Sequence, residues 1–500
     1  MNILKLNPSS ISFLPILVTI PLIYQLLNNF HIGGIELLKD FIISALNPKI
    51  DNEIIFILLK RLNETFLIAF FSWIISLIFG IIFGILSSNI LYKLLNLPIF
   101  LKIFIKFLLT IARSIHEVIW GLILMQIYGI SSSIGIIAIC IPYIAINAKV
   151  FSEQIDTINL KNIESIKQIN GIRFSSVITL VWSPVIKTFK NFGLYRLECA
   201  IRSTAILGLF GIGGIGTSIF LSFQDLNFSE LWTYLWGLSF LIIISKNLLK
   251  RFNLSNTSKE VLISFIVALF FIILFSISFF AYFLFNKNQT TLISLNNLFI
   301  SNYSFISYDF LKLIIETIVL SLYSTGLAIS LPPIFIFIFN NKIGIIAIRS
   351  ISFIFRLIPP PITILILLMF NDPSISLAAL TLGLHNAGIT SNLLLANLNN
   401  QDNKQYIAMK SLGLKKRSSW LFGLFVKQAK SYLAYCAYRS DIIIRETAIL
   451  GVIGSVGLGW QLQESLSSFA WNEITIILFA YSSIAIVGEL INDKIKRNLA

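Results

Sequence analysis

Long apolar runs separated by short polar stretches recur from one end of the chain to the other. Each run holds about 20 residues, enough for a helix to cross a hydrocarbon layer about 30 Å thick. In that layer every backbone N–H and C=O needs a partner within the protein, and a helix supplies these partners within a single segment. The pattern therefore predicts an all-α, polytopic membrane protein.

Six such runs are expected in each half, giving about twelve transmembrane helices. In the first half the runs are Ile11–Leu27, Thr65–Leu86, Ile99–Tyr128, Ile134–Val150, Phe192–Leu221 and Leu231–Leu249. In the second half the runs are Val261–Phe285, Leu311–Phe339, Ile343–Phe370, Ser374–Leu395, Tyr435–Leu458 and Ile474–Ile491. The third run of each half is interrupted, by charged residues after Arg113 and by prolines after Arg356.

Composition agrees with a membrane protein, because 56% of the residues are hydrophobic and only 12% are charged. The formal net charge of +15 does not indicate nucleic-acid binding, since Lys and Arg gather in short loops between apolar runs. The basic stretches all fall on one side of the predicted membrane: Lys149–Lys190, Lys246–Lys259, Asn397–Lys430 and Asp493–Arg497. The positive-inside rule makes that side cytoplasmic and predicts that both termini lie there.

An internal repeat relates the two halves. Residues 195–216 and 438–459, separated by 243 positions, are identical at 12 of 22 positions. The same offset pairs Arg113 with Arg356, and a slightly different one pairs Thr65 with Thr317. An even number of spans in each copy makes the copies parallel, related by an axis along the membrane normal. We therefore expect two repeats of about six helices each, at residues 1–255 and 256–500.

Each repeat carries a basic cytoplasmic loop after its fourth span, at residues 153–175 and 399–425. In each loop a short helical stretch ends at a glycine, Gly171 or Gly413, which can adopt the left-handed cap conformation. A single loop of this kind is most simply a solvated helix. Two copies at matching places favour a helix that docks on a soluble partner.

This spacing resembles the coupling-loop motif of binding-protein-dependent ABC importer permeases: Glu-Ala-Ala, three residues, Gly, then Pro about thirteen residues on. Gly171 and Pro184 keep the last interval, whereas Val426 stands at the Pro position of the second copy. The motif's Glu is replaced by Ser165 in the first copy and by Ile407 in the second. The residues that the resemblance assigns to ATPase coupling are Glu164, Ser165, Lys167, Gly171, Pro184, Ala408, Lys410 and Gly413.

A second resemblance is to the phosphonate-importer permease subfamily. In that subfamily an Arg-x-Ile-Pro-Glu-x-x-Trp stretch precedes a Tyr-Arg-x-Glu-x-x-Ile-Arg-Ser element and a Gly-rich turn. The chain has Arg113-Ser-Ile-His-Glu-Val-Ile-Trp120, with His116 in place of the Pro, and the second copy loses the Glu and the Trp. The Tyr-Arg element begins at Tyr195 in the first copy and at Tyr438 in the second.

Charged residues inside these elements are candidates for the translocation pathway or for structural ion pairs. Glu198 and Arg202 stand four residues apart, as do Asp441 and Arg445, so each acid can reach its base on one helix face. Arg113, Glu117 and Arg356 complete this set of candidates.

Glycines form two further clusters, one in each copy. Neither has the Gly-Lys-Ser/Thr ending of a phosphate loop, so a close helix turn or helix break is the better interpretation. The clusters consist of Gly211, Gly214 and Gly216, and of Gly454, Gly457 and Gly459.

The resemblance implies a type I ABC importer permease with its two copies fused in one chain, in a bacterial inner membrane. Its partners would be an ATPase dimer on the cytoplasmic face and a periplasmic or lipid-anchored solute-binding protein. ATP and Mg²⁺ would bind the ATPase, and the chain itself would be neither an enzyme nor a metal or cofactor protein. The implied solute is a small anion, a phosphonate or a related phosphorus oxyanion. The alternatives are a permease for another solute, such as an amino acid, and an ion-coupled secondary transporter.

A parallel duplication places Lys167 and Lys410 on the same face of the membrane. On a chain without its native cysteines, K167C and K410C should both react with a membrane-impermeant maleimide in inside-out vesicles. Both should stay unlabelled in right-side-out vesicles. Labelling of the two positions from opposite faces would contradict the parallel arrangement.

Overall fold

The structure is a computed structural model that describes residues 12–95, 98–157, 174–251, 308–399, 401–454 and 456–499. Within these ranges the regular elements are helices, and the only β-type pairing is an isolated bridge between Phe30 and Asn371. Five of the described helices are long and apolar enough to cross a membrane, or eight spans result if each of three bent helix pairs counts as one. The all-α, polytopic class is confirmed, and the number of twelve spans stays a prediction.

The chain packs into two compact units. The N-half unit comprises Ser44–Ile293, and the C-half unit combines Met1–Ile43 with Ser294–Ala500. Packing thus assigns the start of the chain to the unit that holds the second repeat. The predicted repeat boundary after residue 255 lies outside the described residues.

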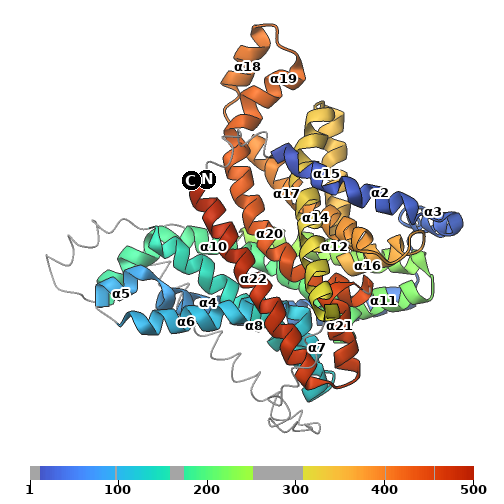
Figure 1. The fold of residues 1–500 in the computed structure, drawn as a ribbon, viewed down its shortest axis with the longest axis horizontal. Helices are drawn as coiled ribbons and strands as arrows, with labels where there is room; N and C mark the ends of the chain where they lie inside the picture. Colours follow the sequence, from blue (N-terminus) through green and yellow to red (C-terminus); the bar gives the residue numbers. More distant parts are fainter. Residues whose placement is uncertain are drawn as a thin grey trace. The chain divides into compact units, whose positions relative to one another are not determined.

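The N-half unit is built around α8, which packs against α4, α6, α7 and α10 and is mostly buried (Figure 1). Its described helices are α4 (Asn52–Ser87), α5 (Asn89–Leu95), α6 (Ile99–Ser114), α7 (Glu117–Tyr128), α8 (Ser132–Asp156), α10 (Phe174–Leu209), α11 (Ile215–Gln224) and α12 (Phe228–Arg251).

A row of small residues lets α4 approach α8 closely. The row repeats every four residues along one face of α4, at Ser72, Ser76, Gly80 and Gly84. A Cβ atom on Gly80 would lie 2.5 Å from the Cβ of Asn147, and one on Gly84 would lie 2.9 Å from the Cβ of Phe151. In a membrane, helices associate through such close van der Waals packing, because lipid removes most of the hydrophobic driving force.

The C-half unit has its most buried helix, α17, packed against α14, α15, α16 and α20. At the start of the chain its elements are η1 (Leu14–Thr19), α2 (Ile20–Asn28), η2 (Ile32–Gly34) and α3 (Ile35–Ser44). From the second repeat come α14 (Tyr308–Ile338), α15 (Lys342–Leu357), α16 (Pro360–Leu367), α17 (Ile375–Asn399), α18 (Lys404–Ser411), α19 (Lys416–Trp420), the π-helical η5 (Leu421–Phe425), α20 (Val426–Gly454), α21 (Gly457–Ser467) and α22 (Trp471–Leu499).

The N-terminal segment is fixed to α14 and α17 of the C-half unit, beside which α2 lies in Figure 1. Leu22 is buried with Leu327 and Ala379. The Asn371 side chain donates to the carbonyl of Leu26 at 2.9 Å, and the N–H of His31 donates to the carbonyl of Phe370 at 3.0 Å. Direct hydrogen bonds between residues more than 300 positions apart therefore join the first apolar run to the second repeat.

The two units contain the same series of helices, in the order α4, α6, α7, α8, α10, α11, α12 and α14, α15, α16, α17, α20, α21, α22. From α6 onward the matching residues are 243 positions apart, whereas Thr65 and Thr317 are 252 apart. The nine extra residues lie between α4 and α6, where α5 has no described counterpart between α14 and α15. A short helix inserted in one copy thus explains the two offsets.

The interruptions predicted in the third run of each half are confirmed as sharp bends. The angle is 85° between α6 and α7 and 98° between α15 and α16. The helix that follows the bend, α7 or α16, begins differently in the two copies. His116 caps α7 by accepting from the N–H of Val118 at 3.2 Å, whereas α16 begins with Pro360 and Pro361, which have no N–H to satisfy.

The glycine clusters lie where α10 turns into α11 and where α20 turns into α21, so the runs predicted as Phe192–Leu221 and Tyr435–Leu458 are each broken. At the first turn Gly211 has φ +92°, and its N–H and that of Ile212 bond back to the last turn of α10. In both copies a threonine hydroxyl caps the helix that follows the turn. The threonine lies on α4 where it caps α11, and on α14 where it caps α21. Thr65 accepts from the N–H of Ile215 at 2.7 Å, and Thr317 accepts from the N–H of Leu458 at 3.0 Å.

The turn between α20 and α21 should not accept a methyl group. A Cβ on Gly451 would lie 2.7 Å from both the Cα of Gly459 and the carbonyl oxygen of Val456. Gly451→Ala is therefore expected to cost about 1–3 kcal/mol of stability. The matched control is Gly33→Ala, whose Cβ would meet nothing nearer than 3.9 Å. Thermal unfolding of the purified chain in detergent measures both, and equal melting temperatures would contradict the tight turn.

Candidate functional site

The second predicted coupling loop forms a helical hairpin, α18 and α19, that projects from the N-terminal end of α20 (Figure 1). Helix α18 ends in a Schellman motif: the N–H of Gly413 bonds to the carbonyl of Lys410 at 3.1 Å, and that of Leu414 bonds to the carbonyl of Met409 at 3.3 Å. Gly413 has φ +82°, which a glycine adopts without strain. The turn thus sets the direction in which the chain leaves α18.

The hairpin is held at its base and exposed at its tip. Gly423 in η5 touches the backbone of Tyr406, and Arg417 donates to the carbonyl of Ile338 at the end of α14, at 3.2 Å. No residue of α18 is buried. Ile407 is 58% exposed and Leu412 is 81% exposed.

The hairpin and the start of α20 are strongly basic. Within Asn397–Lys430, seven Lys and Arg residues stand against the single acid Asp402. Apolar side chains surrounded by positive charge suit contact with another protein better than contact with water.

Most of the residues predicted for the first coupling loop lie outside the part of the chain that the structure describes. Glu164, Ser165, Lys167 and Gly171 lie outside the described residues, and Pro184 lies within α10. In the second loop Ala408 and Lys410 are on α18 and both are exposed.

The four-residue acid–base pairs form ion pairs on matching helices. Glu198 and Arg202 are 2.6 Å apart on α10, and Asp441 and Arg445 are in direct contact on buried faces of α20. Arg113 is buried in the last turn of α6, and Arg356 is half-buried in the last turn of α15.

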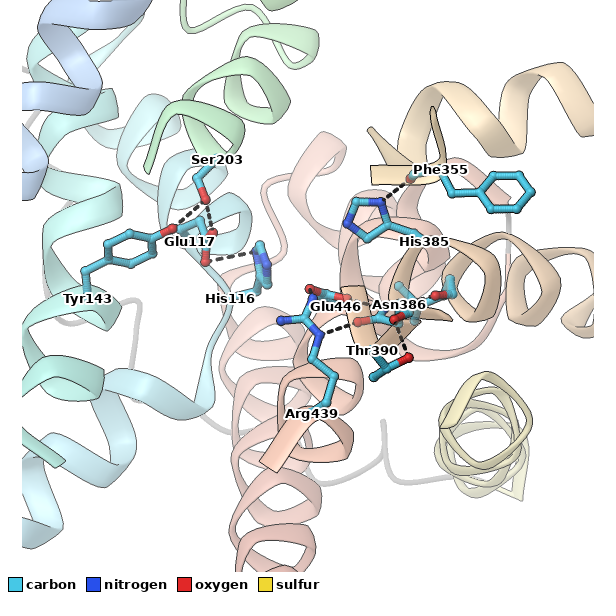
Figure 2. Close-up of polar contacts among 11 residues, drawn as sticks. His116, Glu117, Tyr143, Ser203, Phe355, His385, Asn386, Thr390, Arg439 and Glu446 are labelled. Atoms are coloured by element: carbon cyan, nitrogen blue, oxygen red, sulfur yellow. Dashed lines mark hydrogen bonds and ion pairs between the residues drawn. The ribbon is translucent and has the colours of Figure 1, made fainter. Parts of the chain in front are cut away.

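Glu117 belongs to a buried polar cluster in the N-half unit, which we call the first polar cluster (Figure 2). It consists of His116, Glu117, Tyr143, Arg196 and Ser203. Ser203 on α10 donates to the Glu117 carboxylate at 2.5 Å, and the Tyr143 hydroxyl on α8 lies 2.8 Å from the Ser203 hydroxyl. The Arg196 guanidinium lies 3.6 Å from the centre of the Tyr143 ring, a cation–π distance. The cluster joins α7, α8 and α10.

The C-half unit has a second polar cluster, of Asn386, Arg439 and Glu446 (Figure 2). Arg439 donates to the side-chain oxygen of Asn386 at 2.5 Å and forms an ion pair with Glu446 at 3.1 Å. The Asn386 amide donates to the other Glu446 oxygen at 2.8 Å and to the carbonyl of Leu382. Each member is bonded to the other two, so the buried charge is compensated within the cluster.

Most members of these clusters were not among the residues predicted as candidates from the sequence. A signal was nevertheless present, because the 243-residue offset pairs Tyr143 with Asn386, Arg196 with Arg439, and Ser203 with Glu446. Polar residues therefore occupy matching positions in otherwise apolar helices of both copies. Their mutual contact became visible only in the packed structure.

The chain is similar in sequence to permease proteins of phosphate and phosphite transport systems. No protein-family model matches the chain. A phosphate-import permease protein from Mycolicibacterium smegmatis is 21% identical over 411 residues, which cover 74% of this chain and 74% of the relative. Because 74% of the chain exceeds either half, this alignment includes residues of both repeats.

Two shorter matches come from Stutzerimonas stutzeri. A phosphite transport system permease protein is 25% identical over 123 residues, 25% of this chain and 45% of the relative. Another protein, whose name also assigns it to phosphite transport as a permease, is 26% identical over 159 residues, 32% of this chain and 61% of the relative. In both, the match spans less than two thirds of the relative. The predicted resemblance to permeases of phosphorus-oxyanion transport systems is confirmed as a similarity of sequence.

Among solved structures, an amino acid ABC transporter crystallised with histidines matches 39% of this chain and 100% of its own chain. The sequence identity is 21% and the TM-score is 0.31, too low to define a shared fold.

The aromatic ring and the hydroxyl of Tyr143 should contribute separately to the first polar cluster. Tyr143→Phe removes the bond to Ser203 but keeps the ring under Arg196, and is expected to cost about 1 kcal/mol. Tyr143→Ala also removes the ring and should cost about 3–5 kcal/mol. Thermal unfolding in detergent measures both variants, and equal losses would show that the ring does not support the arginine.

Proposed function

We propose that the chain is the transmembrane permease of an ATP-driven importer that moves a small phosphorus oxyanion into the cytoplasm by alternating access. The observation that carries this proposal is the alignment with a phosphate-import permease protein across both repeats. The names of these relatives support phosphate or phosphite as the solute, and the motif resemblance adds a phosphonate. The two repeats would supply in one chain what two separate permease subunits supply elsewhere.

In this proposal a separate ATPase dimer docks on the cytoplasmic face and binds ATP and Mg²⁺. The hairpin of α18 and α19 supports this assignment, because it is exposed and basic and its first helix ends in a Schellman motif at Gly413. A solute-binding protein would deliver the anion at the opposite face of a bacterial inner membrane. Both termini would then lie in the cytoplasm.

The second candidate is an ion-coupled secondary transporter. One observation favours it: the carboxylate of Glu117 is buried and that of Glu446 is 13% exposed, and acids inside a membrane protein can relay protons. Their hydrogen bonds to Ser203 and Asn386 give them an equally good structural role. The energy source of transport separates the two candidates.

The test is uptake of radiolabelled phosphate, phosphite and methylphosphonate by cells that produce the chain from its native locus and by a deletion strain. Uptake of at least one anion should be lost on deletion, be blocked by vanadate and survive a protonophore while cellular ATP is maintained. Uptake that persists without ATP and collapses with the protonophore would instead establish ion coupling. Unchanged uptake of all three anions would contradict a phosphorus oxyanion as the solute.

The hairpin tip should be needed for ATPase docking but not for folding. Leu412→Asp places a charge at an exposed apolar position and is expected to reduce co-purification of the ATPase and uptake by about tenfold or more. The matched control is Leu226→Asp, at an exposed leucine between α11 and α12. Both variants should reach the membrane at wild-type levels. Undiminished ATPase co-purification with Leu412→Asp would remove the hairpin from the docking surface.

A further inference from the structure

The base of the hairpin contains a π-helical turn, η5, between α19 and α20. The N–H of Val426 bonds to the carbonyl of Leu421, five residues earlier, whereas an α-helix bonds four residues back. Single π turns of this kind are rare and are often found at functional sites. Residues 178–182, which lie 243 positions earlier in the chain, belong to the α-helix α10, so the π turn distinguishes the second repeat from the first.

The wide turn brings two aromatic side chains together. Trp420 and Phe425 are stacked, with ring centres 5.3 Å apart and ring planes inclined by 17°. On an α-helix, side chains five residues apart point about 140° away from each other and could not stack. The π turn places more residues in each turn and so brings both rings to one face of the helix. Both residues are buried in the C-half unit.

The stacked pair is the centre of a group of rings that we call the aromatic joint. The aromatic joint consists of Phe13, Phe337, Trp420, Phe425 and Tyr432. Phe13, in front of η1 at the start of the chain, meets Phe425 edge-on at 5.6 Å and Phe337 at 6.5 Å. Phe337, near the end of α14, lies 6.2 Å from Trp420. The joint thus connects the base of the hairpin to α14 and to the start of the chain.

Two hydrogen bonds also hold the base of the hairpin to α14. The Tyr432 hydroxyl donates to the carbonyl of Ile329 at 2.6 Å, and Arg417 of α19 donates to the carbonyl of Ile338 at 3.2 Å. Close-packed interiors have low compressibility and transmit strain. A tilt of the hairpin must therefore displace α14 and the ring of Phe13, which packs against the same core.

We propose that Phe13 is a positioning residue for the hairpin, and that movement of the hairpin is transmitted through the aromatic joint to the start of the chain. This inference rests on the proposed function, because the ATPase is the partner that moves the hairpin. The docking tip is distinct from the joint: Leu412 is 81% exposed, whereas Phe425 is 0% exposed. Docking and transmission are thus separable by mutation.

The first experiment removes the Phe13 ring from the full chain in complex with its ATPase. Phe13→Ala should leave co-purification of the ATPase unchanged, because the hairpin tip is intact. It should raise the amount of ATP hydrolysed per anion taken up by about threefold or more. Phe13→Leu, which keeps an apolar side chain but no ring, should give an intermediate ratio. A merely structural role would lower the amount of complex and leave this ratio unchanged.

The matched control is Phe30→Ala. It removes a ring from the same N-terminal segment, where that ring contacts Phe370 rather than the aromatic joint. This variant should keep the wild-type ratio of ATP to anion.

A second experiment tests the joint without the ATPase. Nitroxide labels at L412C and I346C, on a chain without its native cysteines, report the position of the hairpin relative to α15; both sites are exposed. Phe13→Ala should broaden the distance distribution measured by double electron–electron resonance, because the hairpin is no longer held at its base. Phe30→Ala should leave the distribution unchanged.

Two results overturn the proposal. One is a wild-type distance distribution in Phe13→Ala, which would show that the ring does not position the hairpin. The other is a wild-type ratio of ATP to anion, which would show that motion is not transmitted through the start of the chain. Failure of the proposed function is distinguishable from both, because it would appear as wild-type uptake that does not depend on ATP.

Discussion

The constraint on which this structure depends is that backbone polar groups in hydrocarbon must find partners inside the protein. An unbroken helix meets the constraint by itself, but the chain interrupts its helices at four matching places. Each interruption exposes N–H groups at the start of the next helix. Threonine hydroxyls cap α11 and α21, a histidine caps α7, and prolines that lack an N–H begin α16.

Comparison of these helix caps shows which contacts the two copies have in common. The threonine caps are kept in both copies, although the threonines and the N–H groups that they accept from follow different sequence offsets. A second contact behaves in the same way: Asn147 donates to the carbonyl of Ser76, and the matching Thr390 donates to the carbonyl of Ala328. The contact between the two helices is maintained although the donor residue changes.

The two repeats differ at α5 and in the packing of the start of the chain. Helix α5 is held in the N-half unit by Asp156, whose carboxylate accepts from the N–H and side chain of Asn89 at 2.7 and 2.6 Å. The start of the chain packs on the second repeat rather than on its own. If the proposed function holds, a single chain would present two unequal halves to one motor, whereas a homodimer presents two identical ones.

The amino-acid sequence determined the all-α membrane class, the duplication, the interruption of each third run and the similarity to phosphorus-oxyanion permeases, because hydrophobic runs and identical motifs are local properties of the chain. It also showed that an acid and a base four residues apart could pair on α10 and α20. Only the tertiary structure decided that residues 12–31 pack on the second repeat, and that Glu117 bonds to Ser203 while Glu446 bonds to Asn386. Such contacts join residues 60 to several hundred positions apart, and which buried polar groups meet is set by helix packing, which no local pattern records.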